Sequence, residues 1–319
     1  MSKLRSALLL FLKGIAMGAA DVVPGVSGGT IAFITGIYGQ LLDGISAFSS
    51  RDTYKHLIAG EFKLFWHRVN GSFLLILMSG IGISIVSFAK VIFYFLTHHP
   101  EAIWSFFFGL VLVSCFYVGK EVGEWSVKNV LTLLSGVFIA YQITEMSTVS
   151  IEPTNLMVFC SGAIAICAMI LPGISGSFIL LTLGMYSHII GALKNLDLEV
   201  VAVFMAGNAL GLLLFSRFLG YLLHRHRNIT LAFLTGLLVG SLNKVWPWKL
   251  TLSFRTNSHG LQVPLFQENI SPFNYQALTG FDSHLILGVG LMFAGVLLVV
   301  GLSFVGEKFR DIEGSVKTD

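Results

Sequence analysis

The stretch Pro24-Gly25-Val26-Ser27-Gly28-Gly29 decides the fold, because it interrupts a long apolar segment and returns later as Pro172-Gly173-Ile174-Ser175-Gly176-Ser177. A Gly and a Tyr follow both copies at matched positions, Gly36 and Tyr38 against Gly184 and Tyr186. Pro and Gly break the hydrogen-bond ladder of a helix, and free backbone groups persist at membrane depth only inside protein or beside a polar cavity. Two matched breaks in the two halves of a chain indicate the binding site of a transporter.

The composition is that of a polytopic, all-α membrane protein. Of the 319 residues, 55% are hydrophobic and only 12% are charged, and the mean hydropathy is +0.80. These values exclude an ordinary soluble domain. The net charge of +3 is too small to indicate nucleic-acid binding. The three cysteines lie in or beside apolar segments without metal-type spacing, so we expect neither a metal site nor a cofactor.

The similarity between the halves extends well beyond the two breaks, which indicates a duplication of residues 1–150 and 151–319. The breaks align at an offset of 148 residues and the later segments at 127, so the first half carries 21 extra residues within 43–70. The segments that align at the shorter offset include Met78, Gly80, Phe88, Lys90, Tyr94, Leu96 and His99 with Met205, Gly207, Phe215, Arg217, Tyr221, Leu223 and His226.

The distribution of Lys and Arg predicts the orientation of each segment, because basic loops stay in the cytoplasm. Both termini are expected on that side, and the two broken segments are expected to enter as re-entrant hairpins from opposite faces, which makes an inverted-topology repeat. The insertion mixes basic and aromatic residues and suits an amphipathic helix on the cytoplasmic leaflet. The predicted elements are a hairpin at 14–42, the amphipathic insertion at 43–70, spans at 72–96, 102–118 and 129–141, a second hairpin at 155–193, spans at 200–223 and 229–245, an external loop at 246–282 and a sixth span at 285–305.

The residues after each break are candidates for binding an anion. A helix N-terminus with Ser and Gly offers backbone N–H donors, a positive dipole end and a hydroxyl. The alternative is that Gly and Ser only allow tight helix packing. The predicted phosphate-binding residues of the breaks are Ser27, Gly28, Gly29, Thr30, Ser175, Gly176 and Ser177.

Two cations inside predicted spans are further candidates. Lys90 and Arg217 occupy equivalent positions of the repeat, and Tyr94 and Tyr221 follow each of them by four residues. Both cations share a stripe with small residues, which predicts that they face the interior of the bundle and bind the substrate. The alternative is that they extend to the nearer headgroups at the surface of the membrane.

Asp21 lies three residues before the first break and has no acidic counterpart, because Met169 stands in its place. A single carboxylate beside a broken helix is a candidate carrier of a proton or sodium ion. A helix-capping role is the equal alternative.

The run from Gly14 to Thr30, with its Pro-Gly-Val-Ser-Gly-Gly-Thr ending, and the second run from Leu171 to Phe178 resemble the bacterial polyprenyl-phosphate transporter family. The resemblance covers nearly the whole chain. It implies a multi-pass protein of the bacterial plasma membrane that returns undecaprenyl phosphate, the carrier lipid of cell-wall synthesis, from the outer to the inner leaflet. It leaves open whether a homodimer forms.

Two other functions remain at this point. One is an ion-coupled carrier of a small anion or a sugar. The other is an undecaprenyl-diphosphate phosphatase, whose motif reads Pro-Gly-x-Ser-Arg-Ser-Gly. Here Gly28 and Gly176 stand where that Arg would grip the phosphate. Metal-assisted phosphate cleavage also needs clustered carboxylates, and only Asp21 lies near a break, so we do not expect an enzyme.

Overall fold

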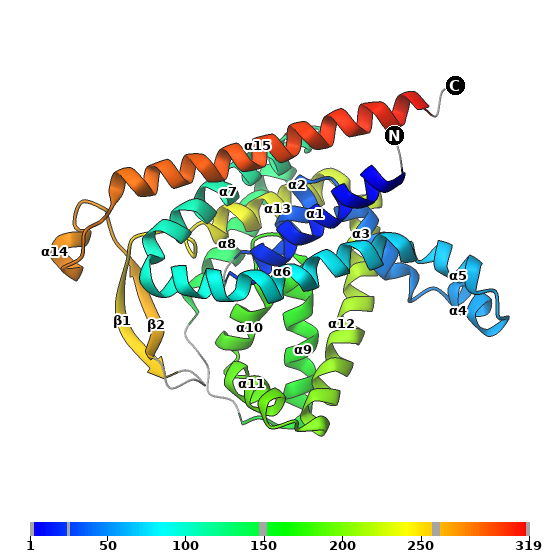
Figure 1. Cartoon of the computed structure of the whole chain (residues 1–319), viewed down its shortest axis with the longest axis horizontal. Coiled ribbons are helices and arrows are strands. Elements are labelled where there is room, and N and C mark those ends of the chain that lie inside the picture. The colour runs from blue at the N-terminus through cyan, green and yellow to red at the C-terminus, as the bar shows by residue number, and fades with distance from the viewer. Residues whose placement is uncertain (1–2, 24–25, 147–151, 257–261, 317–319) are drawn as a thin grey trace.

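The computed structural model describes residues 3–23, 26–146, 152–256 and 262–316, which are mostly helical (Figure 1). Pro24 and Gly25 of the first break lie outside the described residues. The helices of the first half are α1 (Lys3–Asp21), α2 (Gly28–Ile34), α3 (Tyr38–Ala47), α4 (Arg51–Ile58), α5 (Phe62–Arg68), α6 (Gly71–His98), α7 (Pro100–Lys120) and α8 (Val127–Glu145). The second half contains α9 (Asn155–Ile170), α10 (Gly176–Thr182), α11 (Tyr186–Lys194), α12 (Leu198–Arg225), α13 (Arg227–Ser241), β1 (Lys249–Thr256), β2 (Gln262–Asn269), α14 (Tyr275–Thr279) and α15 (Leu285–Val316).

The helical membrane protein predicted from composition is confirmed in outline. Within the described ranges, α6, α7, α8 and α12 are long and apolar enough to cross a membrane. The pair α10 and α11 is bent by 109° at a short break, as in a re-entrant segment. The helix α13 has 15 residues and spans only about 22 Å, which is less than the apolar thickness of a bilayer. Length and composition therefore support four of the six predicted spans, namely 72–96, 102–118, 129–141 and 200–223.

The turn within each hairpin needs a glycine. Gly36 separates α2 from α3 with φ of 72°, and Gly184 separates α10 from α11 with φ of 71°. This left-handed region is unfavourable for residues with a Cβ atom. Both glycines follow their break at the same distance, which explains why the sequence repeats them.

The long helices pack as pairs that cross at glycines. The pairs are α1 with α6, α9 with α12, α8 with α13 and α7 with α15. A Cβ atom at Gly80 would lie 2.4 Å from the carbonyl oxygen of Phe11, and one at Gly207 would lie 2.1 Å from that of Phe159. Small residues allow this close approach of helix backbones in membrane proteins. In Figure 1, α6, α7 and α15 run along the long axis of the molecule, whereas α9 and α12 run across it.

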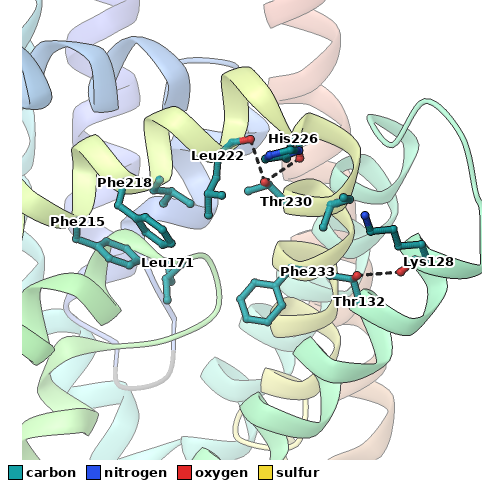
Figure 2. Close-up of a pocket in the computed structure, with 11 residues that line it drawn as sticks. Lys128, Thr132, Leu171, Phe215, Phe218, Leu222, His226, Thr230 and Phe233 are labelled. Atoms are coloured by element: carbon teal, nitrogen blue, oxygen red, sulfur yellow. Dashed lines mark hydrogen bonds between the residues drawn. The ribbon is translucent and has the colours of Figure 1, made fainter.

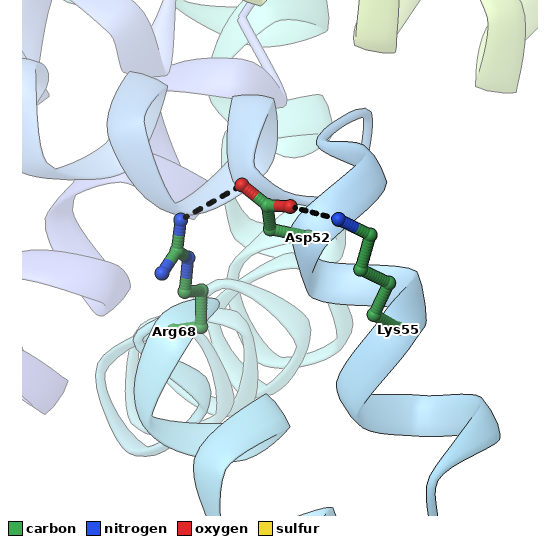
Figure 3. Close-up of polar contacts among 3 residues, drawn as sticks. All are labelled: Asp52, Lys55 and Arg68. Atoms are coloured by element: carbon green, nitrogen blue, oxygen red, sulfur yellow. Dashed lines mark hydrogen bonds and ion pairs between the residues drawn. The ribbon is translucent and has the colours of Figure 1, made fainter.

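The insertion at 43–70 differs from the single amphipathic helix that the sequence predicts. It contains the end of α3 and two short helices, α4 and α5, which project from the body beside one another (Figure 1). Gly60, with φ of 73°, lies between them. Asp52 pairs with Lys55 of its own helix at 2.9 Å and with Arg68 of α5 at 3.8 Å, so only the second pair links the two helices (Figure 3). These pairs are exposed and contribute little to stability.

The predicted external loop contains an antiparallel hairpin of β1 and β2, so the all-α prediction is wrong in this segment. Leu250, Leu252 and Phe254 alternate with polar residues along β1, which is the period of a strand and was the available signal. The hairpin connects to the helices through Trp248, whose Nε1–H donates to the carbonyl of Ser283 at 2.9 Å.

Candidate substrate-binding site

The two breaks meet in the interior of the protein. The Ser27 hydroxyl donates to the carbonyl of Met169 at 2.8 Å, and the Gly173 N–H donates to the Thr30 hydroxyl at 3.1 Å. The side chains of Ser27 and Thr30 are 1% and 0% exposed. A Cβ atom at Gly29 would lie 2.5 Å from the carbonyl oxygen of Ile170. The polar groups of one break therefore satisfy the backbone of the other at a buried junction.

Asp21, the acidic residue before the first break, accepts a hydrogen bond from the backbone of that break. The Gly28 N–H donates to Oδ1 of Asp21 at 2.7 Å, and the Gly29 N–H donates to Oγ of Ser27 at 3.0 Å. A Cβ atom at Gly28 would lie 2.6 Å from Oδ2 of Asp21. Of the donors expected to hold an anion, the Gly28 N–H is thus occupied by a carboxylate and the Gly29 N–H by the Ser27 hydroxyl, and the capping role of Asp21 is observed. The capping geometry leaves its role in ion coupling untested.

The second break lacks such a carboxylate. The hydroxyls of Ser175 and Ser177 pair with each other at 2.9 Å, and no side chain caps α10 within the described structure. Ser175 is buried and Ser177 is exposed, while Gly176 packs against the carbonyl of Ala165. An anion at this break would not have to displace an acidic side chain.

Lys244 is a cation beside the second break, and sequence reasoning missed it. Its Nζ lies 4.5 Å from the centre of the Phe178 ring, and it lines a small pocket with Ser175 and Ser241. A cation over an aromatic face is attracted by the ring. The available signal was a lysine inside the predicted span 229–245, the same signal that selected Lys90 and Arg217.

The inward orientation predicted for Lys90 and Arg217 is wrong. Both side chains are exposed, and Tyr94 and Tyr221 are 52% and 60% exposed. The reason is geometric, because Ser84, at 0% exposure, precedes Lys90 by six residues, which turns the two side chains about 120° apart around α6. A stripe of i+3 steps drifts around a helix, so the glycine and serine pack inward while the lysine faces outward.

The structure contains a groove between α12, α13 and α8 that the sequence did not reveal (Figure 2). Its volume is about 420 Å³, and Phe215, Phe218 and Phe233 form most of its apolar wall. Leu171, the residue before the second Pro-Gly, lies in the lining, and Lys128 and His226 lie at one end. These residues come from four separate segments, so only tertiary packing brings them together.

The sequence is similar to those of known proteins. A family model described as undecaprenyl phosphate translocase-like (VCA0040-like) matches residues 17–263. The chain belongs to this family. A family relative from Vibrio cholerae, named polyprenyl-phosphate transporter, is 51% identical over 306 residues, which cover 96% of this chain and 99% of that protein. A Staphylococcus aureus protein of the same name is 32% identical over 255 residues, covering 74% and 85%. No solved structure matches the chain.

The region matched by the family model includes both breaks, the groove and Lys244. It also includes β1 and the first two residues of β2, because it ends at residue 263. The family resemblance stated from the two Pro-Gly runs is therefore confirmed over most of the chain.

Proposed function

We propose that this protein carries undecaprenyl phosphate from the outer to the inner leaflet of the bacterial plasma membrane without hydrolysing it. The observation that carries the proposal is the buried junction of the two breaks in a chain of this family. Two relatives named polyprenyl-phosphate transporters support the choice of substrate. Broken helices that meet inside a membrane protein are the usual setting of a transporter's binding site.

The two halves, 1–150 and 151–319, form an inverted repeat in this proposal. Equivalent helices make equivalent crossings, since α1 packs on α6 as α9 packs on α12, and α7 packs on α15 as α13 packs on α8. Gly14 and Gly80 at the first crossing align with Gly162 and Gly207 at the second. All six long segments then cross the membrane, with the hairpins 14–42 and 155–193 entering from opposite faces.

Contacts between loops support the proposed sidedness, with both termini in the cytoplasm. Glu121 and Arg227, from two predicted cytoplasmic loops, form an ion pair at 2.5 Å. Glu101 and Tyr275, from two predicted outer loops, share a hydrogen bond. Asn243 donates to Oε1 of Glu145 at 2.7 Å on the same predicted outer side. Loops predicted to lie on one face thus contact each other.

The phosphate binds first at the second break, where Ser175, Gly176 and Ser177 provide donors and Lys244 provides a positive charge. It passes to Ser27, Gly28, Gly29 and Thr30 when Asp21 leaves the Gly28 N–H. Asp21 now occupies the position that a phosphate oxygen would take, so its release couples the two sites. Lys90 with Tyr94, and Arg217 with Tyr221, receive the headgroup at the lipid-facing surface of α6 and α12, one near each leaflet.

Inward movement of an anion needs a compensating force. A membrane potential that is negative inside opposes it by about 2.3 kcal/mol per charge per 100 mV. A proton or sodium ion carried by Asp21 would offset this cost, as would consumption of the lipid in the cytoplasm. Asp21 is suited to the first route because it lies at the junction itself.

The test is translocation of undecaprenyl phosphate in proteoliposomes, with released phosphate measured in parallel. We expect wild-type protein to move the lipid without liberating phosphate. We expect Lys244→Gln, Lys90→Gln and Arg217→Gln to slow transport by about tenfold each, as is typical for loss of a charged contact. The matched control is Lys120→Gln, an exposed lysine at the end of α7.

The outcomes separate the functions. Liberated phosphate would identify an enzyme, and transport of a small anion instead of the lipid would identify the alternative carrier. Lipid transport that is equal in all four variants would leave the function standing and contradict the proposed site.

A further inference from the structure

We propose that the groove between α12, α13 and α8 is an inner-leaflet exit site, which holds the first isoprene units of a polyprenyl phosphate while Lys128 contacts the phosphate (Figure 2). This inference rests on the proposed function and adds to it a separate site for the lipid chain.

The lining suits a hydrocarbon chain. The volume of about 420 Å³ lies within the range of small-molecule sites, roughly 300–1,000 Å³. The two threonines in the wall do not make it polar, because their hydroxyls are already bonded. Thr132 donates to the carbonyl of Lys128 at 2.8 Å, and Thr230 donates to that of His226 at 2.9 Å. The wall therefore offers an occupant mainly aromatic and aliphatic surface.

The mouth suits a single phosphate. Figure 2 shows Lys128 extending from α8 toward Thr230 and His226 of the neighbouring helices. Within the described ranges, its ammonium group forms no hydrogen bond or ion pair with another residue. Glu121, the acidic residue of the adjacent loop, is instead paired with Arg227. An anionic headgroup joined to an apolar chain complements this arrangement of charge and surface.

The groove also lies on the path that the lipid would take. Leu171 lines it and directly precedes Pro172 of the second break. Phe218 on the opposite wall is 55% exposed, so the groove is open at the surface of α12. A long isoprenoid can therefore extend from the groove into the bilayer, while its phosphate moves from the junction to the cytoplasmic end of α8.

The experiment measures binding to full-length protein in nanodiscs, with farnesyl phosphate, farnesol and inorganic phosphate as separate probes. We expect Lys128→Gln to weaken binding of farnesyl phosphate by about tenfold or more and to leave farnesol unchanged. We expect Leu222→Trp, which fills the groove, to weaken both prenyl probes. Matched controls are Lys120→Gln and Leu210→Trp, the latter an exposed residue on the far side of α12.

Equal binding of farnesyl phosphate by these groove variants and their controls would overturn the proposal. Binding of inorganic phosphate without binding of either prenyl probe would also overturn it. If Leu222→Trp fails to fold, a photoreactive farnesyl phosphate replaces it, and labelling of wild-type protein outside α8, α12 and α13 would overturn the proposal. Proteoliposome transport is measured with the same variants. Failure of wild-type transport would reject the proposed function, whereas normal transport with unaltered binding in the groove variants would reject only this site.

Discussion

Asp21 caps the first break, and substitutions can separate this role from its proposed role as an ion carrier. As a cap it needs an oxygen that accepts from Gly28, and as an ion carrier it needs a charge. Asp21→Asn keeps the acceptor, so we expect the unfolding free energy to change by less than about 1 kcal/mol, whereas Asp21→Leu should cost about 1–2 kcal/mol. We expect both substitutions to lower lipid transport. Thermal unfolding and proteoliposome transport measure the two effects, and full transport by Asp21→Asn would assign the residue to capping alone.

Lys249 is expected to make the stability of the β1–β2 hairpin depend on pH. Burial lowers the pKa of Lys249 to about 7, the charge of Lys244 lowers this pKa further, and Glu145 opposes the shift. In an unfolded hairpin the pKa returns to about 10.4, so the unfolded form binds more protons between these values. We therefore expect the hairpin to become more stable as pH rises from about 7 to 10. Urea unfolding followed by Trp fluorescence at pH 7 and 9.5 measures this, and Lys249→Met should remove the dependence. The same pH dependence in both proteins would exclude Lys249 as its cause.

At the scale of elements, the close crossing of α9 and α12 requires a residue without a Cβ atom at position 207. A Cβ atom at Gly207 would lie 2.1 Å from the Phe159 carbonyl oxygen, so Gly207→Ala must separate the two helices. We expect a loss of about 1–3 kcal/mol in unfolding free energy, the usual cost of overpacking. Gly220 on the same helix has no atom within 4 Å of such a Cβ, so Gly220→Ala should be neutral or stabilising by up to about 1 kcal/mol. Equal melting temperatures for the two variants would contradict the crossing.

The elements also show what a sequence can predict. Breaks and turns were visible because Pro, Gly36 and Gly184 impose local backbone geometry that any context must accept. The sequence did not reveal which face of a helix points inward, because Ser84 and Lys90 share an apparent stripe yet differ in exposure. The junction of the breaks required knowledge of the fold, because Ser27 and Met169 are 142 residues apart. The groove was invisible for the same reason, and Lys244 was overlooked although its charge within an apolar segment was a usable signal.

At the scale of the whole molecule, the two halves are equivalent in packing but differ at their breaks. The first break is capped by Asp21, and the second has Met169 at that position and Lys244 nearby. A symmetric junction would hold an anion equally at both breaks. In the proposed mechanism this asymmetry makes the two sites unequal: the second break is open and has a cation nearby, whereas the first accepts a phosphate only when a carboxylate moves.

The proposed inverted arrangement predicts which loops face outward. Trp125 lies between α7 and α8 and is 50% exposed, and Phe273 lies between β2 and α14 and is 81% exposed. In a Cys160→Ser background, which removes the exposed native thiol, we expect an impermeant maleimide to label Phe273→Cys in intact cells. Trp125→Cys should react only after the membrane is permeabilised, because Lys120 and Lys128 flank its loop and predict a cytoplasmic position. Labelling of both cysteines from outside would contradict the proposed topology, because α7 would cross the membrane between Glu101, which is bonded to Tyr275, and the loop that contains Trp125.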